Sequence, residues 1–264
     1  MSEIDFANNR LTNSGLNFLL KSVQSNLKIS TQLENLNLSF NKLGDKAVDS
    51  LCTFIESPKC ELLRINLEAN FLGDKVISKL CETINKHLYD KLLLLNLGQN
   101  NISEQGGRKV ATVIENCKMI QVMILYWNKI SNGAAAEIIK QMKQHTHLRI
   151  FDISWNNIGD SLIEKTGTDD LINSIQMASN KEPAIENSEV KNYFNVTLSG
   201  MRSSMSMDFT KLKTGNKLKK TTDFANELSE YFCEKNIYLI HLDISHNNIS
   251  FEDAKLLSRR IILY

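Results

Sequence analysis

The sequence lacks the features that mark secreted, membrane-bound and disulfide-rich proteins. Its 264 residues include 2 prolines and 5 cysteines, and no two cysteines form a Cys-x-x-Cys pair. An odd number of cysteines without such pairs favours a reduced intracellular protein over a disulfide framework. No apolar run approaches the roughly 18 residues of a membrane-spanning helix, and the first residues carry no basic and apolar signal segment. These absences predict a cytoplasmic protein without a membrane partner.

A surplus of charge of one sign is also missing. The 31 Lys and Arg residues nearly balance the 30 Asp and Glu residues, which leaves a formal net charge of +1. This balance argues against a nucleic-acid partner. The sequence contains no Gly-x-x-x-x-Gly-Lys-[Ser/Thr] phosphate loop, no His-Glu-x-x-His motif and no zinc-type spacing of Cys and His. We therefore expect no enzyme activity, no cofactor and no metal ion.

What the sequence does contain is a repeated pattern, Leu-x-x-Leu-x-Leu-x-x-Asn-x-Leu, in which Ile, Phe or Met can replace Leu. Complete copies begin at Leu33, Leu62, Leu92, Ile120, Leu148 and Leu239, and a partial copy precedes them. Seven copies of a five-position pattern do not arise by chance, so an internal repeat organises the chain. The asparagine at position nine is present in every copy: Asn9, Asn41, Asn70, Asn100, Asn128, Asn156 and Asn247.

Each copy predicts one strand followed by one helix. Apolar residues at positions four and six suit a short strand with one buried face. The asparagine can bond the backbone where the chain leaves the strand, so stacked copies would form an asparagine ladder. Apolar residues at helical spacing follow, such as Leu51, Phe54 and Ile55. From Asn9 to Asn156 the asparagines are 28 to 32 residues apart, which leaves room for both elements.

These features predict an α/β solenoid, a single domain over residues 1–264. Seven parallel strands would line the concave face of a horseshoe arc, and the helices would form its convex face. One copy cannot bury its apolar face alone, so neighbouring copies must complete the core.

The residues of the repeat also resemble those of known families. Asn-x-[Ile/Leu]-[Gly/Ser]-[Asp/Glu] after each strand resembles the ribonuclease-inhibitor class of leucine-rich repeats, over residues 1–159 and 223–264. Leu-Asn-Leu-Ser-Phe-Asn-Lys-Leu-Gly-Asp and Phe-Asp-Ile-Ser-Trp-Asn-Asn-Ile-Gly-Asp particularly resemble leucine-rich-repeat proteins of cilia and flagella. They are also similar to the repeat arrays of NOD-like receptors and of the activator of the GTPase Ran.

The resemblance implies a protein-binding scaffold or adaptor, a subunit of a hetero-oligomeric assembly, with a ciliary axoneme as its setting. The alternative that it leaves open is a GTPase-activating protein like the Ran activator. The acidic tail of that activator is missing here, and no catalytic arginine can be matched position by position.

The repeat is interrupted once. Asn156 and Asn247 are 91 residues apart, so about 63 residues exceed one ordinary copy. The spacing predicts an insertion over 160–222, in the strand-to-helix loop of the sixth copy. Its serine-rich and lysine-rich composition is typical of partly disordered segments. Within it, Asp169–Ser179 could form a helix, and Tyr193–Leu198 a strand that joins an edge of this sheet or of a partner. The insertion is either a tolerated surface loop or a second contact with a partner.

Positions three, five, seven and eight of the pattern point outward from the concave face. The first copies hold polar residues there, whereas the later copies hold apolar and aromatic ones, and both tryptophans fall at position eight of neighbouring copies. Exposed apolar patches with polar rims mark interaction sites. The residues that we expect to bind a partner protein are Phe40, Val122, Ile124, Tyr126, Trp127, Ile150 and Trp155. The alternative is that the two tryptophans pack on the strand-to-helix loops or lie beneath the insertion.

Overall fold

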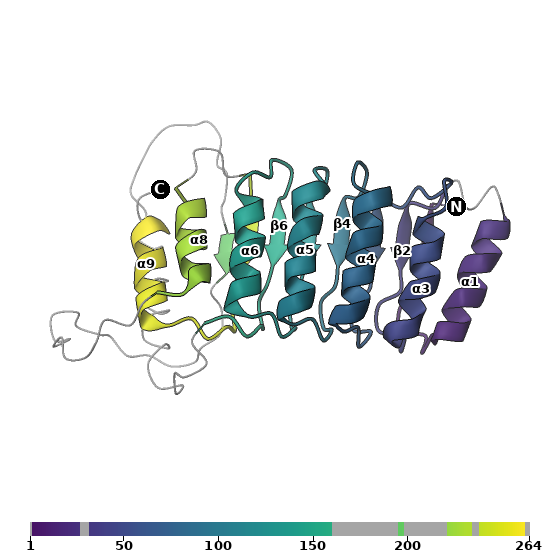
Figure 1. The fold of residues 1–264 in the computed structure, drawn as a ribbon, viewed down its shortest axis with the longest axis horizontal. Helices are drawn as coiled ribbons and strands as arrows, with labels where there is room; N and C mark the ends of the chain where they lie inside the picture. Colours follow the sequence, from purple (N-terminus) through teal and green to yellow (C-terminus); the bar gives the residue numbers. More distant parts are fainter. Residues whose placement is uncertain (1, 27–31, 160–194, 198–220, 234–237, 262–264) are drawn as a thin grey trace.

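The computed structural model describes residues 2–26, 32–159, 195–197, 221–233 and 238–261. In this part of the chain, three-residue strands alternate with helices of 9 to 14 residues (Figure 1). The strands are β1 (Glu3–Asp5), β2 (Asn35–Asn37), β3 (Arg64–Asn66), β4 (Leu94–Asn96), β5 (Val122–Ile124), β6 (Ile150–Asp152), β7 (Asn195–Thr197) and β8 (His241–Asp243). The helices are α1 (Asn13–Ser25), α3 (Gly44–Ile55), α4 (Asp74–His87), α5 (Glu104–Asn116), α6 (Asn132–Met142), α8 (Asp223–Tyr231) and α9 (Phe251–Ile261).

The strands form one parallel sheet in the order β1-β2-β3-β4-β5-β6-β8-β7. In every strand except β7, the central residue is position four of the repeat. These central residues are Cα partners across neighbouring strands: Ile4, Leu36, Ile65, Leu95, Met123, Phe151 and Leu242. Because position four always meets position four, each position of the repeat forms a straight column along the solenoid.

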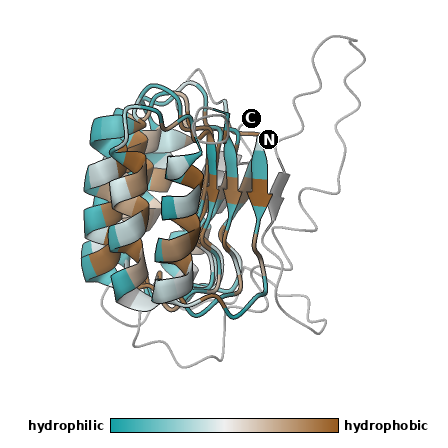
Figure 2. Cartoon of the chain, turned by 90° about the vertical axis from the view of Figure 1, so that its right-hand side faces the viewer, coloured by the Kyte–Doolittle hydropathy of each residue, from teal (hydrophilic) through white to brown (hydrophobic). Residues whose placement is uncertain are grey.

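One layer of helices covers one face of the sheet, as the view along the solenoid axis shows (Figure 2). The core lies between the two layers, where the repeat's apolar positions are buried. Leu33, Leu36, Leu38 and Leu43, for example, are at most 2% exposed. Packed helices lie about 8–10 Å apart, whereas strands lie about 4.8 Å apart, so the strands occupy the inner side of the arc. The predicted layering of an α/β solenoid is confirmed.

The position-nine asparagines join neighbouring copies. The Asn128 side chain donates from Nδ2 to the carbonyl oxygens of Leu125 (3.0 Å) and Tyr126 (3.3 Å) in its own copy. It also donates to the carbonyl oxygen of Leu97 (3.0 Å) in the preceding copy. Asn9 begins the column and is exposed, and its Nδ2 donates only within its own copy, to Ala7. The donation to the preceding copy is shared by Asn41, Asn70, Asn100, Asn156 and Asn247.

The copies on the two sides of the predicted insertion are direct neighbours. Strand β6 pairs with β8, and α8 packs beside α6 (Figure 1). Residues 160–194 and 198–220 lie outside the described part of the chain, as does the predicted helix Asp169–Ser179. In the chain, the long segment therefore lies between β6 and α8, at the place of the strand-to-helix loop of the sixth copy.

The seven strands expected from the repeat are all present, and strand β7 is an additional one. The sequence predicts seven, one for each copy, and the sheet contains eight. Strand β7 comes from the predicted strand Tyr193–Leu198 and pairs in parallel with β8, on the side away from β6. The alternating pattern of this segment lets its backbone continue the ladder as a repeat strand would, without the rest of the repeat.

Both ends of the long segment are fixed to the solenoid. At its start, Gly159 donates its N–H to Asn132 Oδ1 (2.8 Å) and accepts from Asn132 Nδ2 (2.7 Å). Gly159 has φ +114°, and a Cβ atom there would lie 1.6 Å from the carbonyl oxygen of Asn248, so only glycine fits. At its end, Thr222 donates its N–H to Oδ1 of the buried Asp253 at 2.7 Å. The solenoid thus continues without a change of register.

Candidate protein-binding surface

The outward columns of the first three copies are mostly polar, apart from Ala7, Phe40 and Ala69, and some of their polar groups bond one another. Asn37 Nδ2 donates to Asp5 Oδ2 at 3.0 Å, and Arg64 Nη1 donates to Asn35 Oδ1 at 3.1 Å. These contacts each join two neighbouring strands. The polar groups of this end of the concave face therefore find partners within the face itself.

The outward columns of β4, β5 and β6 contain an apolar row. Leu94, Val122 and Ile150 occupy position three and are Cα partners in consecutive strands. Leu94 and Val122 are half-buried, and Ile150 is 36% exposed. Ile124, at position five of β5, is half-buried beside this row. Because adjacent strands lie about 4.8 Å apart, we treat these four residues as one surface, the apolar row.

Position eight has a left-handed backbone in every copy. The residues and φ angles are Asn8 (58°), Phe40 (54°), Ala69 (54°), Gln99 (53°), Trp127 (52°), Trp155 (53°) and His246 (53°). The turn is held by the sheet: Trp127 N donates to Ser154 O, and Trp155 N donates to Ser245 O, both at 2.9 Å. This conformation suits Gly and Asn, and it costs a bulky side chain about 1 kcal/mol. Four of the seven copies nevertheless carry an aromatic ring there.

Three of these rings form a continuous stack. The ring centroids of Trp127 and Trp155 are 5.1 Å apart, at 13° between the planes. Those of Trp155 and His246 are 3.7 Å apart, at 18°. Trp127 is 57% exposed and Trp155 is 45% exposed, so neither ring is buried against the strand-to-helix loops. We call Trp127, Trp155 and His246 the aromatic stack; whether residues 160–222 cover it lies outside the described residues.

Tyr126 is half-buried and lies over the preceding copy. Its hydroxyl donates to Glu68 Oε1, two copies away, and accepts from Gln99 Nε2 at 2.8 Å. A Cβ atom on Gly98 would lie 2.5 Å from the Tyr126 ring, so the missing side chain makes room for the tyrosine. Burial and the hydrogen bond with Glu68 raise the pKa of Tyr126 to about 12. Among the expected binding residues, Tyr126 therefore already forms side-chain hydrogen bonds within the concave face.

Phe40 is not part of the aromatic stack. It is 47% exposed in the same column, but the copies carrying Ala69 and Gln99 stand between it and Trp127. His246 is not among the residues expected to bind a partner, yet its ring extends the stack by one copy. The sequence signal was available, since His246 stands at the same position as the two tryptophans.

Two carboxylates lie beside the apolar row. Asp152 and Asp243 are Cα partners at position five of β6 and β8. Asp152 Oδ1 accepts from Ser154 N (3.0 Å) and Ser154 Oγ (2.7 Å), and Asp243 Oδ1 accepts from Ser245 N (2.8 Å). Burial raises the pKa of Asp152, and the neighbouring charge of Asp243 raises it further. Asp152 thus stabilises the turn that precedes Trp155, and Asp243 stabilises the turn that precedes His246.

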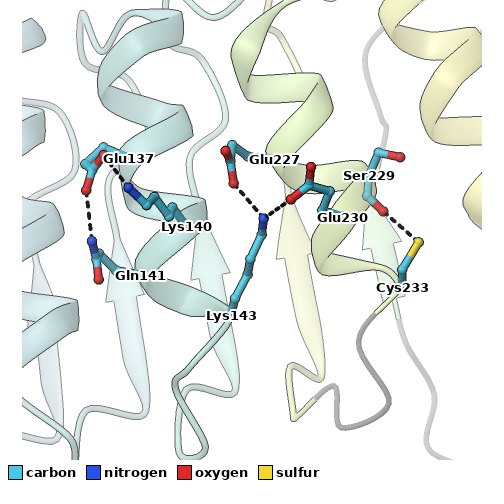
Figure 3. Close-up of polar contacts among 8 residues, drawn as sticks. All are labelled: Glu137, Lys140, Gln141, Lys143, Glu227, Ser229, Glu230 and Cys233. Atoms are coloured by element: carbon cyan, nitrogen blue, oxygen red, sulfur yellow. Dashed lines mark hydrogen bonds and ion pairs between the residues drawn. The ribbon is translucent and has the colours of Figure 1, made fainter.

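The helix layer has a different electrostatic pattern. Lys143, at the end of α6, places Nζ 2.6 Å from both Glu227 Oε2 and Glu230 Oε2 of α8 (Figure 3). The Lys143 ammonium lowers the pKa of Glu230. This contact fastens α6 to α8 across the interruption of the repeat.

The described residues suggest no metal site, and four of the five cysteines are buried. They contain no group of three or more His, Cys, Asp and Glu side chains that could hold a metal ion. Burial raises the pKa of the Cys52, Cys60 and Cys117 thiols, which keeps them protonated in the core. What the described surface offers is exposed apolar area on a rigid sheet.

Comparison with known proteins identifies the repeat. A family model described as Leucine Rich repeat matches residues 30–52, 144–161 and 235–258. No curated protein matches the chain. In the described residues no helix is long and apolar enough to cross a membrane. Together with the parallel sheet and its helix layer, the matches show an α/β leucine-rich-repeat solenoid. Repeats of this kind generally serve to bind other proteins rather than to catalyse reactions.

Proposed function

We propose that this protein is a non-catalytic scaffold or adaptor that binds another protein through the concave face of copies four to seven. The aromatic stack carries the proposal. A tryptophan stabilises its own fold mainly by burying its ring, yet Trp127 and Trp155 remain 57% and 45% exposed in a backbone conformation unfavourable to them. Binding of a partner would bury these rings and offset that cost.

The composition and stiffness of the surface support the same proposal. Tryptophan and tyrosine are the residues most enriched at the centres of protein interfaces. The apolar row extends from three hydrogen-bonded strands, and stacking restrains the tryptophan rings. Side chains that are already ordered lose little entropy on binding, which favours affinity.

The setting that we propose rests on the sequence resemblance. We assign the repeats to the ribonuclease-inhibitor type because the asparagines of regular copies are 28 to 32 residues apart. We propose a subunit of a hetero-oligomeric intracellular assembly, with a ciliary axoneme as the setting. The insertion 160–222 follows strand β6 of the sixth copy in the chain and would provide a second contact with the partner.

A capture experiment tests the proposal. The immobilised protein is incubated with an extract of its native source, and bound proteins are quantified by mass spectrometry. The variant Trp127→Ala/Trp155→Ala should lose its specific partner by at least about tenfold, as expected for central interface aromatics. Phe18→Ala is the matched control, because Phe18 is a 76% exposed aromatic residue on α1, in the helix layer.

The stability of each variant is checked by urea unfolding, so that loss of capture is not confused with loss of fold. The proposal predicts capture by the Phe18→Ala variant at the wild-type level. A double tryptophan variant that folds and captures the same proteins as the wild type contradicts it.

A further inference from the structure

Asp152 and Asp243 are adjacent acidic residues of the concave face, and their hydrogen bonds differ from those of Asp5 and Glu68. Asp5 accepts hydrogen bonds from Ala7 N (2.8 Å) and from the Asn37 side chain. Glu68 accepts from the side chains of both Tyr126 and Asn96. The carboxylates of Asp152 and Asp243 bond only the serines two residues further along their own strands, through Oδ1. In the described ranges neither of them forms an ion pair.

The helix layer shows how this chain treats a comparable pair of carboxylates. Glu227 and Glu230 lie on one side of α8, and the Lys143 ammonium lies 2.6 Å from each of them (Figure 3). A cation between two carboxylates removes their mutual repulsion. Asp152 and Asp243 stand on adjacent strands about 4.8 Å apart and form no ion pair within the described residues. The basic side chain that acts electrostatically on Asp152 is that of His241, on β8.

The charge of the whole concave face also favours a basic partner. Its outward columns contain one arginine, Arg64, which already bonds Asn35. The histidines of the last copy, His241 and His246, are its other basic side chains. The same columns contain five acidic residues, in a chain whose formal net charge is +1: Glu3, Asp5, Glu68, Asp152 and Asp243. The concave face is thus the acidic part of an otherwise balanced protein, which makes it complementary to a basic partner.

Apolar and acidic side chains alternate closely at the centre of this face. Ile150 and Asp152 are two residues apart on β6 and point to the same side. Ile124 is the Cα partner of Asp152 on one side, and Asp243 is its partner on the other. A segment that covers the apolar row would therefore place its next side chain over the two carboxylates.

From this arrangement we propose that the concave face binds a partner segment that is both apolar and basic. Its apolar side chains cover the apolar row and the edge of the aromatic stack, and one arginine or lysine side chain binds between Asp152 and Asp243. Arginine fits better than lysine, because its planar guanidinium can bond both carboxylates at once and can lie against an aromatic ring. The inference rests on the proposed function and adds the chemistry of the partner.

Synthetic peptides test this inference directly. The probe is an acetylated peptide with the core Leu-Arg-Ile-Arg-Leu, and its matched forms carry citrulline or glutamate in place of each arginine. Citrulline keeps the shape of arginine without its charge. The only two tryptophans of the chain are Trp127 and Trp155, so intrinsic tryptophan fluorescence reports on this surface alone. The arginine peptide should bind at least about tenfold more tightly than the citrulline peptide, and the glutamate peptide more weakly still.

A variant without the two charges then tests where the arginine of the peptide binds. Asp152→Asn/Asp243→Asn keeps an acceptor oxygen for Ser154 and Ser245 but removes both charges. It should bind the arginine and citrulline peptides with similar affinity. The matched control is Asp5→Asn, which makes the same change in the same column at the opposite end of the sheet, and it should keep the tenfold preference.

Two outcomes overturn the inference. Equal binding of the arginine and citrulline peptides by the wild type does so without any variant. Retention of the full arginine preference by Asp152→Asn/Asp243→Asn does so as well. Either result leaves the proposed function standing if Trp127→Ala/Trp155→Ala still loses the captured partner, whereas a double tryptophan variant that keeps that partner rejects the docking surface itself.

Discussion

The two ends of the concave face share one backbone and differ in their side chains. In copies one to three, outward polar groups bond one another across strands, as Asn37 does with Asp5. In copies five to seven, the same columns hold the aromatic stack and two carboxylates without an ion pair in the described residues. The strands, the register and the left-handed turn at position eight are the same throughout. The repeat therefore determines the scaffold, and the outward columns determine where a partner can bind.

If the ends differ only in their outward side chains, removing the ladder should damage both equally. Asn128→Ala removes one of the two hydrogen bonds that each of three carbonyl oxygens accepts, and it leaves the N–H of Ile102 without its partner. Asn41→Ala likewise removes three donated hydrogen bonds, together with the acceptor of the Asn9 and Leu11 N–H groups. Each lost hydrogen bond costs about 0.5–1.5 kcal/mol and a buried N–H left unpaired costs about 1–3 kcal/mol, so we expect each variant to lose about 4 kcal/mol of unfolding free energy. Urea unfolding measures the loss.

Asn9→Ala provides the control for the ladder. Asn9 is exposed and donates only to Ala7, so its loss should cost less than about 1 kcal/mol. A large difference between Asn41→Ala and Asn128→Ala would show that the two ends also differ in their scaffold.

The scaffold could be predicted from the sequence because each of its rules is local or periodic. Apolar residues at positions four and six fix the buried face of a strand, and the spacing of the asparagines fixes the place of the helix and of the interruption. The outward columns follow from the same alternation. Position four, for instance, could be assigned to the core at Phe151 and Met123 alike, and both are fully buried.

The contacts within the outward columns could not be predicted in the same way. Tyr126 of the fifth copy bonds Glu68 of the third copy because Gly98, in the copy between them, has no side chain in the way. A periodic pattern does not predict this space. The left-handed turn at position eight could not be predicted either, because Asn8 is the only one of the seven residues there whose type favours this conformation. Strand β7 was expected from its own alternating residues, whereas the repeat pattern did not show that it would pair with β8.

The acidic pair offers a way to separate binding from stability at the C-terminal end. Since the folded-state pKa of Asp152 is raised above its unfolded value, the charged carboxylate weakens the folded state at neutral pH. That cost disappears in acid, as the group becomes protonated. We therefore expect Asp152→Asn to raise the unfolding free energy by about 0.5 kcal/mol at neutral pH and to have no such effect below about pH 4.

Urea unfolding at two pH values measures the effect of Asp152→Asn. Asp5→Asn is the control and should not stabilise the protein, because Asp5 accepts hydrogen bonds from Ala7 and Asn37. A destabilised Asp152→Asn variant would mean that this carboxylate serves the fold, and it would remove the contrast between the two ends.

An effect confined to alkaline pH is expected at the boundary between the two ends, where Tyr126 of the fifth copy bonds Glu68 of the third. Burial and this hydrogen bond raise the pKa of the phenol to about 12, against about 10 for an unfolded chain. The neutral phenol therefore adds stability that is fully present below about pH 10 and is lost as the pH rises to about 12. The difference in phenolate absorbance between the wild type and Tyr126→Phe gives the titration of this one residue. Glu68→Gln should move its midpoint towards 10, because the carboxylate charge that opposes ionisation is gone. A midpoint near 10 in the wild type would mean that the two ends are not joined by this contact.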